Sequence, residues 1–162
     1  MALSEGHIHV AMRNFLKREG WLLIAGQYPG GSDDELHALN VVDPNLARDN
    51  SPDPRRHSKG KLVPDLLAFR NNQLLIVEAK PKYSRDDRDK LRDLLDNRLN
   101  DFLGSLEKFA TERRISAILP LNNLLLIPAL AFSAQEFIEQ PDPGFIYIRI
   151  TNLTEARLEG PF

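Results

Sequence analysis

Two apolar segments joined by a short polar turn constrain the fold of this chain more than any other feature. Residues 61–69 and 73–80 are rich in Leu, Ile and Val, and the polar residues 70–72 lie between them. This pattern predicts a β-hairpin, because asparagine tolerates the backbone conformations that a tight turn requires. Apolar residues occupy both faces of both strands, so we expect a sheet that is covered on each side.

The segments before the hairpin add one helix and one strand. Apolar residues at helical spacing predict a helix over residues 4–19, with Ser4 as its N-cap and Gly20 where a helix C-terminus favours glycine. Residues 21–28 are typical of a strand that ends at the Pro-Gly-Gly sequence which follows.

The segments after the hairpin predict a second helical layer and one more strand. Residues 84–114 are expected to form one long charged helix with an inward apolar stripe and a bend near Gly104. Apolar runs follow around residues 115–119 and 124–127, a short helix could begin at Ser133, and residues 145–150 alternate as a strand does. The predicted fold class is therefore α/β, with a mixed central sheet flanked by helices.

The length of the chain predicts one domain. With 162 residues, of which 42% are hydrophobic, it can bury one sizeable core, so we expect residues 1–162 to form a single domain. A long polar insertion is expected at about residues 29–60, apart from a small apolar island at Leu39, Val41 and Val42. Loops of this length are usually functional or disordered, which favours contact with a partner rather than a place in the core.

Composition excludes several classes of site and protein. The chain has no cysteine, which excludes disulfides, thiolate metal sites and cysteine nucleophiles and leaves oxygen or histidine ligands for any metal. No signal-peptide core and no apolar run of roughly 18 residues is present, so we expect a soluble, intracellular, cytoplasmic protein with no membrane partner. The net charge of -2 predicts that any nucleic acid would be met by a local patch.

The hairpin also predicts a pair of facing carboxylates. Antiparallel pairing about the Asn71-Asn72 turn places Asp65 directly opposite Glu78, with Cβ atoms about 5 Å apart. Two carboxylates so placed in apolar strands repel each other, so a cation must compensate. Lys80 lies two residues beyond Glu78 and projects from the same face. Mg²⁺ suits this site, since it prefers oxygen ligands and keeps several waters, one of which can attack a phosphate.

These residues resemble the signature of the PD-(D/E)XK nuclease superfamily, which includes restriction endonucleases and Holliday-junction resolvases. The resemblance lies in Pro64-Asp65, then Glu78-Ala79-Lys80 after an apolar strand, and spans roughly residues 4–119. It implies a restriction endonuclease-like core with the order helix, three-strand meander, helix and strand. It also implies that Mg²⁺, for which Mn²⁺ could substitute, is held by Asp65, Glu78 and the backbone carbonyl of Ala79.

The resemblance further implies what the remaining site residues do. Lys80 would act on the attacking water, and the products would carry a 5′-phosphate and a 3′-hydroxyl. Many members add a glutamate on the first helix, for which Glu5 is the candidate as both a metal ligand and a catalytic residue, while others have their acid nearer the position of His9. His7 and His9 diverge on a helix, so they are interpreted as surface or core histidines rather than a ligand pair.

Basic residues surround the predicted metal site. Six lysines and arginines precede or follow the residues of this site in the sequence, and we expect them to bind DNA phosphates. They are Arg55, Arg56, Lys59, Lys61, Lys82 and Arg85. The mixed charges of residues 84–114, in contrast, are interpreted as a solvated helix face with ion pairs along the helix.

Together these features predict a magnesium-dependent endonuclease that hydrolyses DNA phosphodiester bonds, acting in restriction, recombination and repair, or genome defence. We expect a homodimer or a partner subunit to contribute to specificity. The alternative is a catalytically inactive relative that serves as a DNA-binding or protein-interaction subunit, and a structural domain with no nucleic-acid role is a third possibility.

Overall fold

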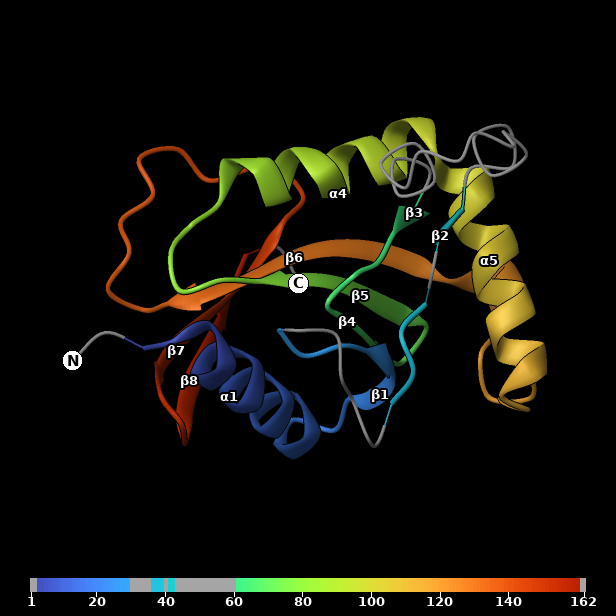
Figure 1. Ribbon diagram of the computed structural model, residues 1–162, viewed down its shortest axis with the longest axis horizontal. Helices are drawn as coiled ribbons and strands as arrows, with labels where there is room; N and C mark the ends of the chain where they lie inside the picture. The colour runs from blue at the N-terminus through green and yellow to red at the C-terminus, as the bar shows by residue number, and fades with distance from the viewer. Residues whose placement is uncertain (1–2, 30–35, 40, 43–60, 161–162) are drawn as a thin grey trace, which may run out of the picture.

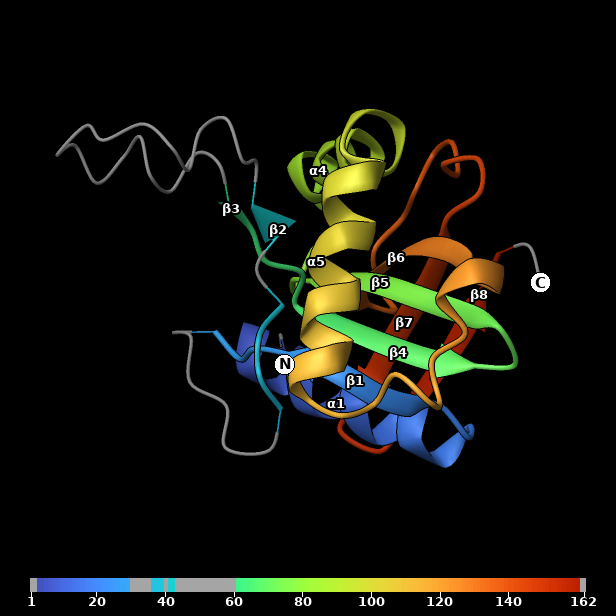
Figure 2. The ribbon, with the colours of Figure 1, turned by 90° about the vertical axis from the view of Figure 1, so that its right-hand side faces the viewer.

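The protein has three layers, with one sheet between two layers of helices. The computed structural model describes residues 3–29, 36–39, 41–42 and 61–160. Helix α1 (Glu5–Arg18) covers one face of a six-stranded sheet, and α4 (Arg85–Asn97) and α5 (Leu99–Glu112) lie on the other face (Figures 1 and 2). The predicted α/β class with a mixed sheet flanked by helices is confirmed. No helix in the described part of the chain has the length and hydropathy needed to cross a bilayer.

The sheet combines antiparallel and parallel pairs. The first three strands in its order form an antiparallel meander, the next two add in parallel, and the last strand is antiparallel. The parallel strand after the meander follows α4 and α5, which cross over one face to reach it. Across the sheet the order is β1 (Leu22–Gly26), β4 (Leu66–Arg70), β5 (Gln73–Ala79), β6 (Leu125–Ser133), β7 (Ile146–Asn152) and β8 (Glu155–Glu159).

The predicted hairpin between β4 and β5 is confirmed together with its register. Asn71 and Asn72 have φ angles of 50° and 67°, so both lie in the left-handed region that a two-residue hairpin turn of type I′ requires. Leu66 lies opposite Val77, and the pairing continues without a shift to the turn. This register points alternate side chains to opposite faces, where each set finds a helical layer to pack against.

Each face of the sheet has its own apolar core. Against α1 pack Leu66, Leu75, Val77, Ile146 and Ile148, which meet Ile8, Met12 and Leu16 of the helix. Against α4 and α5 pack Leu67, Leu74, Ile76 and Tyr147, which meet Leu91, Leu94, Phe102 and Leu106. Burying each such side chain stabilises the fold by about 1.5–3 kcal/mol before conformational entropy is subtracted. The expectation of a sheet covered on both faces is therefore confirmed.

The strand predicted over residues 61–69 is interrupted, which corrects the sequence prediction. Lys61–Leu62 forms β3, which pairs with β2 (Val41–Val42) in a separate two-stranded sheet, and β4 begins only at Leu66. Pro64 lies between them and cannot donate to a strand ladder because it has no N–H. Asp65 therefore lies directly before β4 rather than in the middle of a strand.

Part of the predicted polar insertion belongs to the core, so that prediction was wrong for these residues. Leu39 and Val41 are buried among the residues packed against α5. Their burial follows from the pairing of β2 with β3, a contact between segments far apart in the sequence. Residues 30–35, 40 and 43–60 of the insertion lie outside the described residues.

The helical prediction for residues 84–114 needs correction, because two helices replace one. The backbone leaves the helical region at Arg98, where φ is -126° and ψ is 24°. Asn97 and Asn100 flank this point and are poor helix formers, which makes it the weakest part of the segment. Gly104 causes no bend and lies exposed within α5.

The chain after α5 also departs from the sequence prediction. Of the two apolar runs, residues 115–119 form no strand, whereas most of residues 124–127 belongs to β6. Ser133 ends β6 instead of starting a helix, and residues 134–145 connect β6 to β7. The hairpin from β7 to β8 was missed although Ala156 and Leu158 alternate with charged residues, because a five-residue segment with only two apolar positions gives a weak strand signal.

The hairpin turn provides a test of the fold. We expect Asn72→Ala to lower the free energy of unfolding by about 1 kcal/mol, since alanine disfavours the left-handed region, and Asn72→Gly to leave it within about 0.5 kcal/mol. Urea denaturation measures both values, and Asn122→Ala, at an exposed position outside the turn, is the control. An alanine effect at position 72 no larger than that at position 122 would contradict the assigned turn.

Candidate functional site

Asp65 and Glu78 lie side by side where β4 begins and β5 ends. The paired register ends at Leu66 opposite Val77, and Asp65 and Glu78 are the next residues along the two segments. The Oδ2 atom of Asp65 accepts a hydrogen bond from the backbone N–H of Ala79 at 2.9 Å, so its carboxylate reaches across to the end of β5. Glu78 is 3% exposed. The hairpin thus places one half-buried and one buried carboxylate together.

The end of β1 holds Asp65 from the other side. The backbone N–H of Gln27 donates to the Asp65 carbonyl at 3.0 Å, and the Gln27 side chain lies 3.5 Å from Oδ1 and 3.3 Å from the Val63 carbonyl. These contacts orient a residue that belongs to no strand. Asp65 is therefore positioned by β1 and β5 together, which explains how it keeps its place after Pro64 ends the strand ladder.

The environment of Glu78 disfavours a charged carboxylate. Burial is the main cause that raises the pKa of Glu78 well above its usual value, and the negative charge of Asp65 raises it further. Lys90 of α4 opposes both effects, because its Nζ atom lies 2.6 Å from Oε1 of Glu78. Two ionised carboxylates therefore need a nearby cation, and within the described residues Lys90 supplies one.

The motif lysine contacts a different acid. Lys80 follows β5, is half exposed, and has its Nζ atom 3.9 Å from Oε1 of Glu5 at the start of α1. The end of β5 and the N-terminal ends of α1 and α4 lie together at one end of the sheet, at the left in Figure 1. The structure thus brings Glu5, Asp65, Glu78 and Lys80 to one region, although the lysine paired with Glu78 is Lys90.

The charges of α4 are not all solvated, which corrects the sequence interpretation. Asp87 is only 9% exposed, and burial is the largest cause that raises its pKa, with Lys80 and Lys90 acting in the opposite direction. Asp87 and Lys90 face the end of β5 from the first turns of the helix. Helical spacing could have revealed this, since Asp87, Leu91 and Leu94 lie at i, i+4 and i+7.

His9 lies over Asp65 on the α1 side. Its ring is 1% exposed, and Nε2 lies 3.8 Å from Oδ2 of Asp65. Burial, the largest cause, lowers the pKa of His9, so the imidazole is neutral near pH 7 and can offer a lone pair to a metal. His7 instead bonds with the Ser4 N-cap, so the two histidines diverge as predicted.

The donor atoms at this site suit a hard divalent cation. Asp65 and Glu78 offer two carboxylates. The backbone N–H of Ala79 points toward Asp65, and in extended backbone the carbonyl of the same residue points to that side as well. No cluster of three or more His, Asp or Glu side chains arranged for a metal occurs among the residues that the structure describes. Mg²⁺ needs only one or two carboxylates, since waters and phosphate complete its shell.

The predicted basic rim is described only in part. Arg55, Arg56 and Lys59 lie outside the described residues, as does the side chain of Lys61. Lys82 and Arg85 are exposed between β5 and α4, directly after the motif lysine. Two of the six predicted rim side chains, Lys82 and Arg85, are therefore described, and both are open to solvent.

The ion pair between Lys90 and Glu78 predicts a pH-dependent stability. In Lys90→Met the pKa of Glu78 should rise further. At high pH the buried carboxylate would then be ionised without its partner, which destabilises the fold, whereas at low pH it would be protonated and would need no partner. We expect a loss of about 2 kcal/mol in unfolding free energy at pH 8, after allowing for the partial exposure of Lys90, and a smaller loss at pH 5. Chemical denaturation at both pH values measures this.

The control for that measurement is Lys108→Met on the exposed side of α5. It should change stability little and equally at both pH values. Equal losses at pH 5 and pH 8 in Lys90→Met would show that the lysine contributes packing rather than charge.

Comparisons with known proteins identified no relative of this chain. No family model matches it, and neither a curated protein nor a solved structure does. Its function is therefore to be inferred from the chemistry of its own residues.

Proposed function

We propose that this protein is a magnesium-dependent endonuclease of the PD-(D/E)XK type that hydrolyses DNA phosphodiester bonds. One observation carries the proposal. Asp65 and Glu78 meet across the hairpin, with Ala79 bound to Asp65 and Lys80 at the end of the same strand. Adjacent carboxylates in a largely buried position are unfavourable by themselves, so their presence favours a site that binds a cation.

The arrangement of the sheet supports the proposal. Strands β1, β4 and β5 form a meander, and α4 and α5 then lead to β6, which pairs with β5 in parallel. With α1 in front, this is the order of helix, three strands, helix and strand that the sequence resemblance implies. The proposed site lies at the carboxyl end of β5, beside the N-terminal ends of α1 and α4.

In the proposed mechanism the residues of the hairpin hold the metal and the nearby lysine handles the water. Asp65, Glu78 and the carbonyl of Ala79 would bind Mg²⁺, with His9 or Glu5 on α1 as further donors. When bound, Mg²⁺ would polarise the phosphate and lower the pKa of a water molecule. Lys80 would orient the attacking water, and Glu5, 3.9 Å from its ammonium group, would hold the lysine in place.

The charges around the site favour a phosphodiester substrate. Lys82 and Arg85 are exposed close to Lys80 and could contact the phosphates that flank the cleaved bond. Selectivity for a particular DNA sequence would then depend on a second copy or a partner subunit, as expected for a restriction, recombination or genome-defence component.

A second candidate function follows from the ion pair of Glu78. Lys90 lies 2.6 Å from the carboxylate and already supplies the positive charge that a metal would bring. This observation favours a catalytically inactive relative that binds DNA or protein. Such a protein would keep a salt-sensitive affinity for DNA, lost when Arg55, Arg56 and Lys59 are neutralised, and would cut nothing.

The nuclease proposal predicts the loss of cutting in three variants. We expect Asp65→Asn, Glu78→Gln and Lys80→Met each to lower the rate of Mg²⁺-dependent cleavage by on the order of 10²- to 10⁴-fold, because each removes a ligand or the group that orients the water. Cleavage is measured on duplex, branched and single-stranded DNA, with and without EDTA. Glu107→Gln, exposed on α5, is the matched control and should cut normally.

Thermal unfolding must show that each variant remains folded. Cutting that survives all three substitutions would refute the mechanism. Folded wild-type protein that binds DNA but never cuts it would favour the inactive relative instead.

A further inference from the structure

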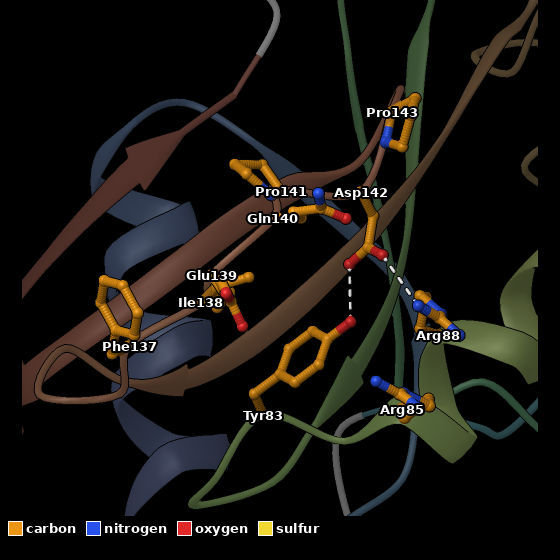
Figure 3. Close-up of a pocket in the computed structure, with 10 residues that line it drawn as sticks. All are labelled: Tyr83, Arg85, Arg88, Phe137, Ile138, Glu139, Gln140, Pro141, Asp142 and Pro143. Carbon is orange, nitrogen blue, oxygen red and sulfur yellow. Dashed lines mark hydrogen bonds and ion pairs between the residues drawn. The ribbon is translucent and has the colours of Figure 1, made fainter.

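A hollow of about 550 Å³ lies between α4 and the connection from β6 to β7, at the end of the sheet that also carries the candidate site (Figure 1). It is separate from the carboxylates of the hairpin, yet Tyr83 on its wall comes three residues after Lys80. The residues that line it are Tyr83, Arg85, Arg88 and those at positions 137–143 (Figure 3).

The wall of this hollow is already organised. Asp142 accepts hydrogen bonds from the hydroxyl group of Tyr83 at 2.8 Å and from Arg88 at 3.2 Å (Figure 3). It also accepts one from the hydroxyl group of Tyr147 at 2.7 Å. Arg92 donates to the carbonyl of Pro143 at 2.6 Å. These bonds tie the connection from β6 to β7 to the first turns of α4, so a ligand would enter a preformed pocket and lose little free energy in ordering it.

The rim of the hollow carries an aromatic ring that the protein does not bury. Phe137 is 86% exposed, more than any other large apolar side chain in the described part of the chain. Figure 3 shows its ring at one side of the hollow, with Tyr83 and the arginines of α4 at the other. An exposed ring of this kind gains free energy only if a flat or apolar group covers it, and a nucleobase is such a group.

The polar groups around the ring suit the rest of a nucleotide. Arg85 is exposed on α4 and offers a planar cation to a phosphate. Glu139 and Gln140 are also exposed on the wall and present a carboxylate and an amide, which can accept from and donate to the edge of a base. Asp142 is already paired with Arg88 and with two hydroxyl groups, so its charge does not repel the phosphate strongly.

The position of the hollow relates it to the proposed cleavage site. Arg85 and Arg88 line it from the first turn of α4, and this end of α4 and the connection from β6 to β7 lie at the same end of the sheet as the end of β5 (Figure 1). A DNA strand whose phosphate meets the carboxylates would therefore pass close to the hollow. A base can enter only if it is unpaired, because duplex stacking hides its faces.

We propose that this hollow binds an unpaired nucleotide next to the phosphate that is cleaved, with its base on Phe137 and its phosphate on Arg85. The proposal rests on the proposed nuclease function and narrows its substrate class to single-stranded DNA or to duplex DNA with an unpaired end or flap. The hollow supplies the selectivity for unpaired strands, while Asp65, Glu78 and Lys80 supply the chemistry.

The test measures binding without cleavage. A single-stranded oligonucleotide with one 2-aminopurine is titrated with the full chain in EDTA, and fluorescence quenching reports stacking of the base, with the matching duplex as the comparison. We expect quenching with the single strand, tighter binding of it than of the duplex, and about tenfold weaker binding in Phe137→Ala. Arg85→Gln should weaken binding and lower the slope of log affinity against log salt by about 0.7.

Matched controls are Leu153→Ala, an exposed apolar residue at the turn between β7 and β8, and Arg113→Gln at the end of α5. Both should bind as the wild type does. Equal affinity of Phe137→Ala and wild type, preference for the duplex, or no binding of either DNA would overturn the proposal. Because no metal is present, these results do not depend on cutting. If the protein cuts DNA but Phe137→Ala leaves its binding unchanged, only the proposed role of the hollow is refuted. If the protein binds the single strand but never cuts it, only the proposed nuclease activity is refuted.

Discussion

The antiparallel register between β4 and β5 is the constraint on which the rest of this structure depends. Two asparagines in the left-handed region close the turn, and every later pair in the hairpin follows from it. A slip by one residue would exchange the two faces of a strand, so that the side chains now packed on α1 would meet α4 and α5. The same slip would separate Asp65 from Glu78. One local turn thus sets both the packing of the two cores and the proximity of the carboxylates.

The carboxylates in turn shape the electrostatics at the end of the sheet. Glu78 is buried beside Asp65, and two helices bring Lys90, Asp87 and Glu5 toward them. Ion pairs distributed over these residues compensate charges that would otherwise destabilise the fold. A metal would change that balance, because it would add positive charge where Lys90 now provides it. Stability and the proposed chemistry are therefore linked through the same buried glutamate.

Helix α4 contributes residues both to the candidate site and to the wall of the hollow. Its inward side carries Asp87 and Lys90 toward the hairpin, and its first turn also holds Arg85 and Arg88 at the wall of the hollow. Hydrogen bonds from Arg88 and Arg92 fasten the connection from β6 to β7 to this helix. In the proposed complex the base would rest on Phe137 of this connection and the phosphate on Arg85 of α4, two parts that these hydrogen bonds join.

Sequence by itself determined the features that depend on neighbouring residues. These are α1 with its Ser4 cap, the hairpin and its register, the opposition of Asp65 and Glu78, and the alternation that requires a sheet covered on both faces. Only the tertiary structure decided which lysine meets Glu78, that Leu39 and Val41 enter the core, that the helix breaks at Arg98 and that β8 completes the sheet. The reason is physical: turn chemistry and side-chain periodicity act over a few residues, whereas burial and ion pairing arise between segments that only folding brings together.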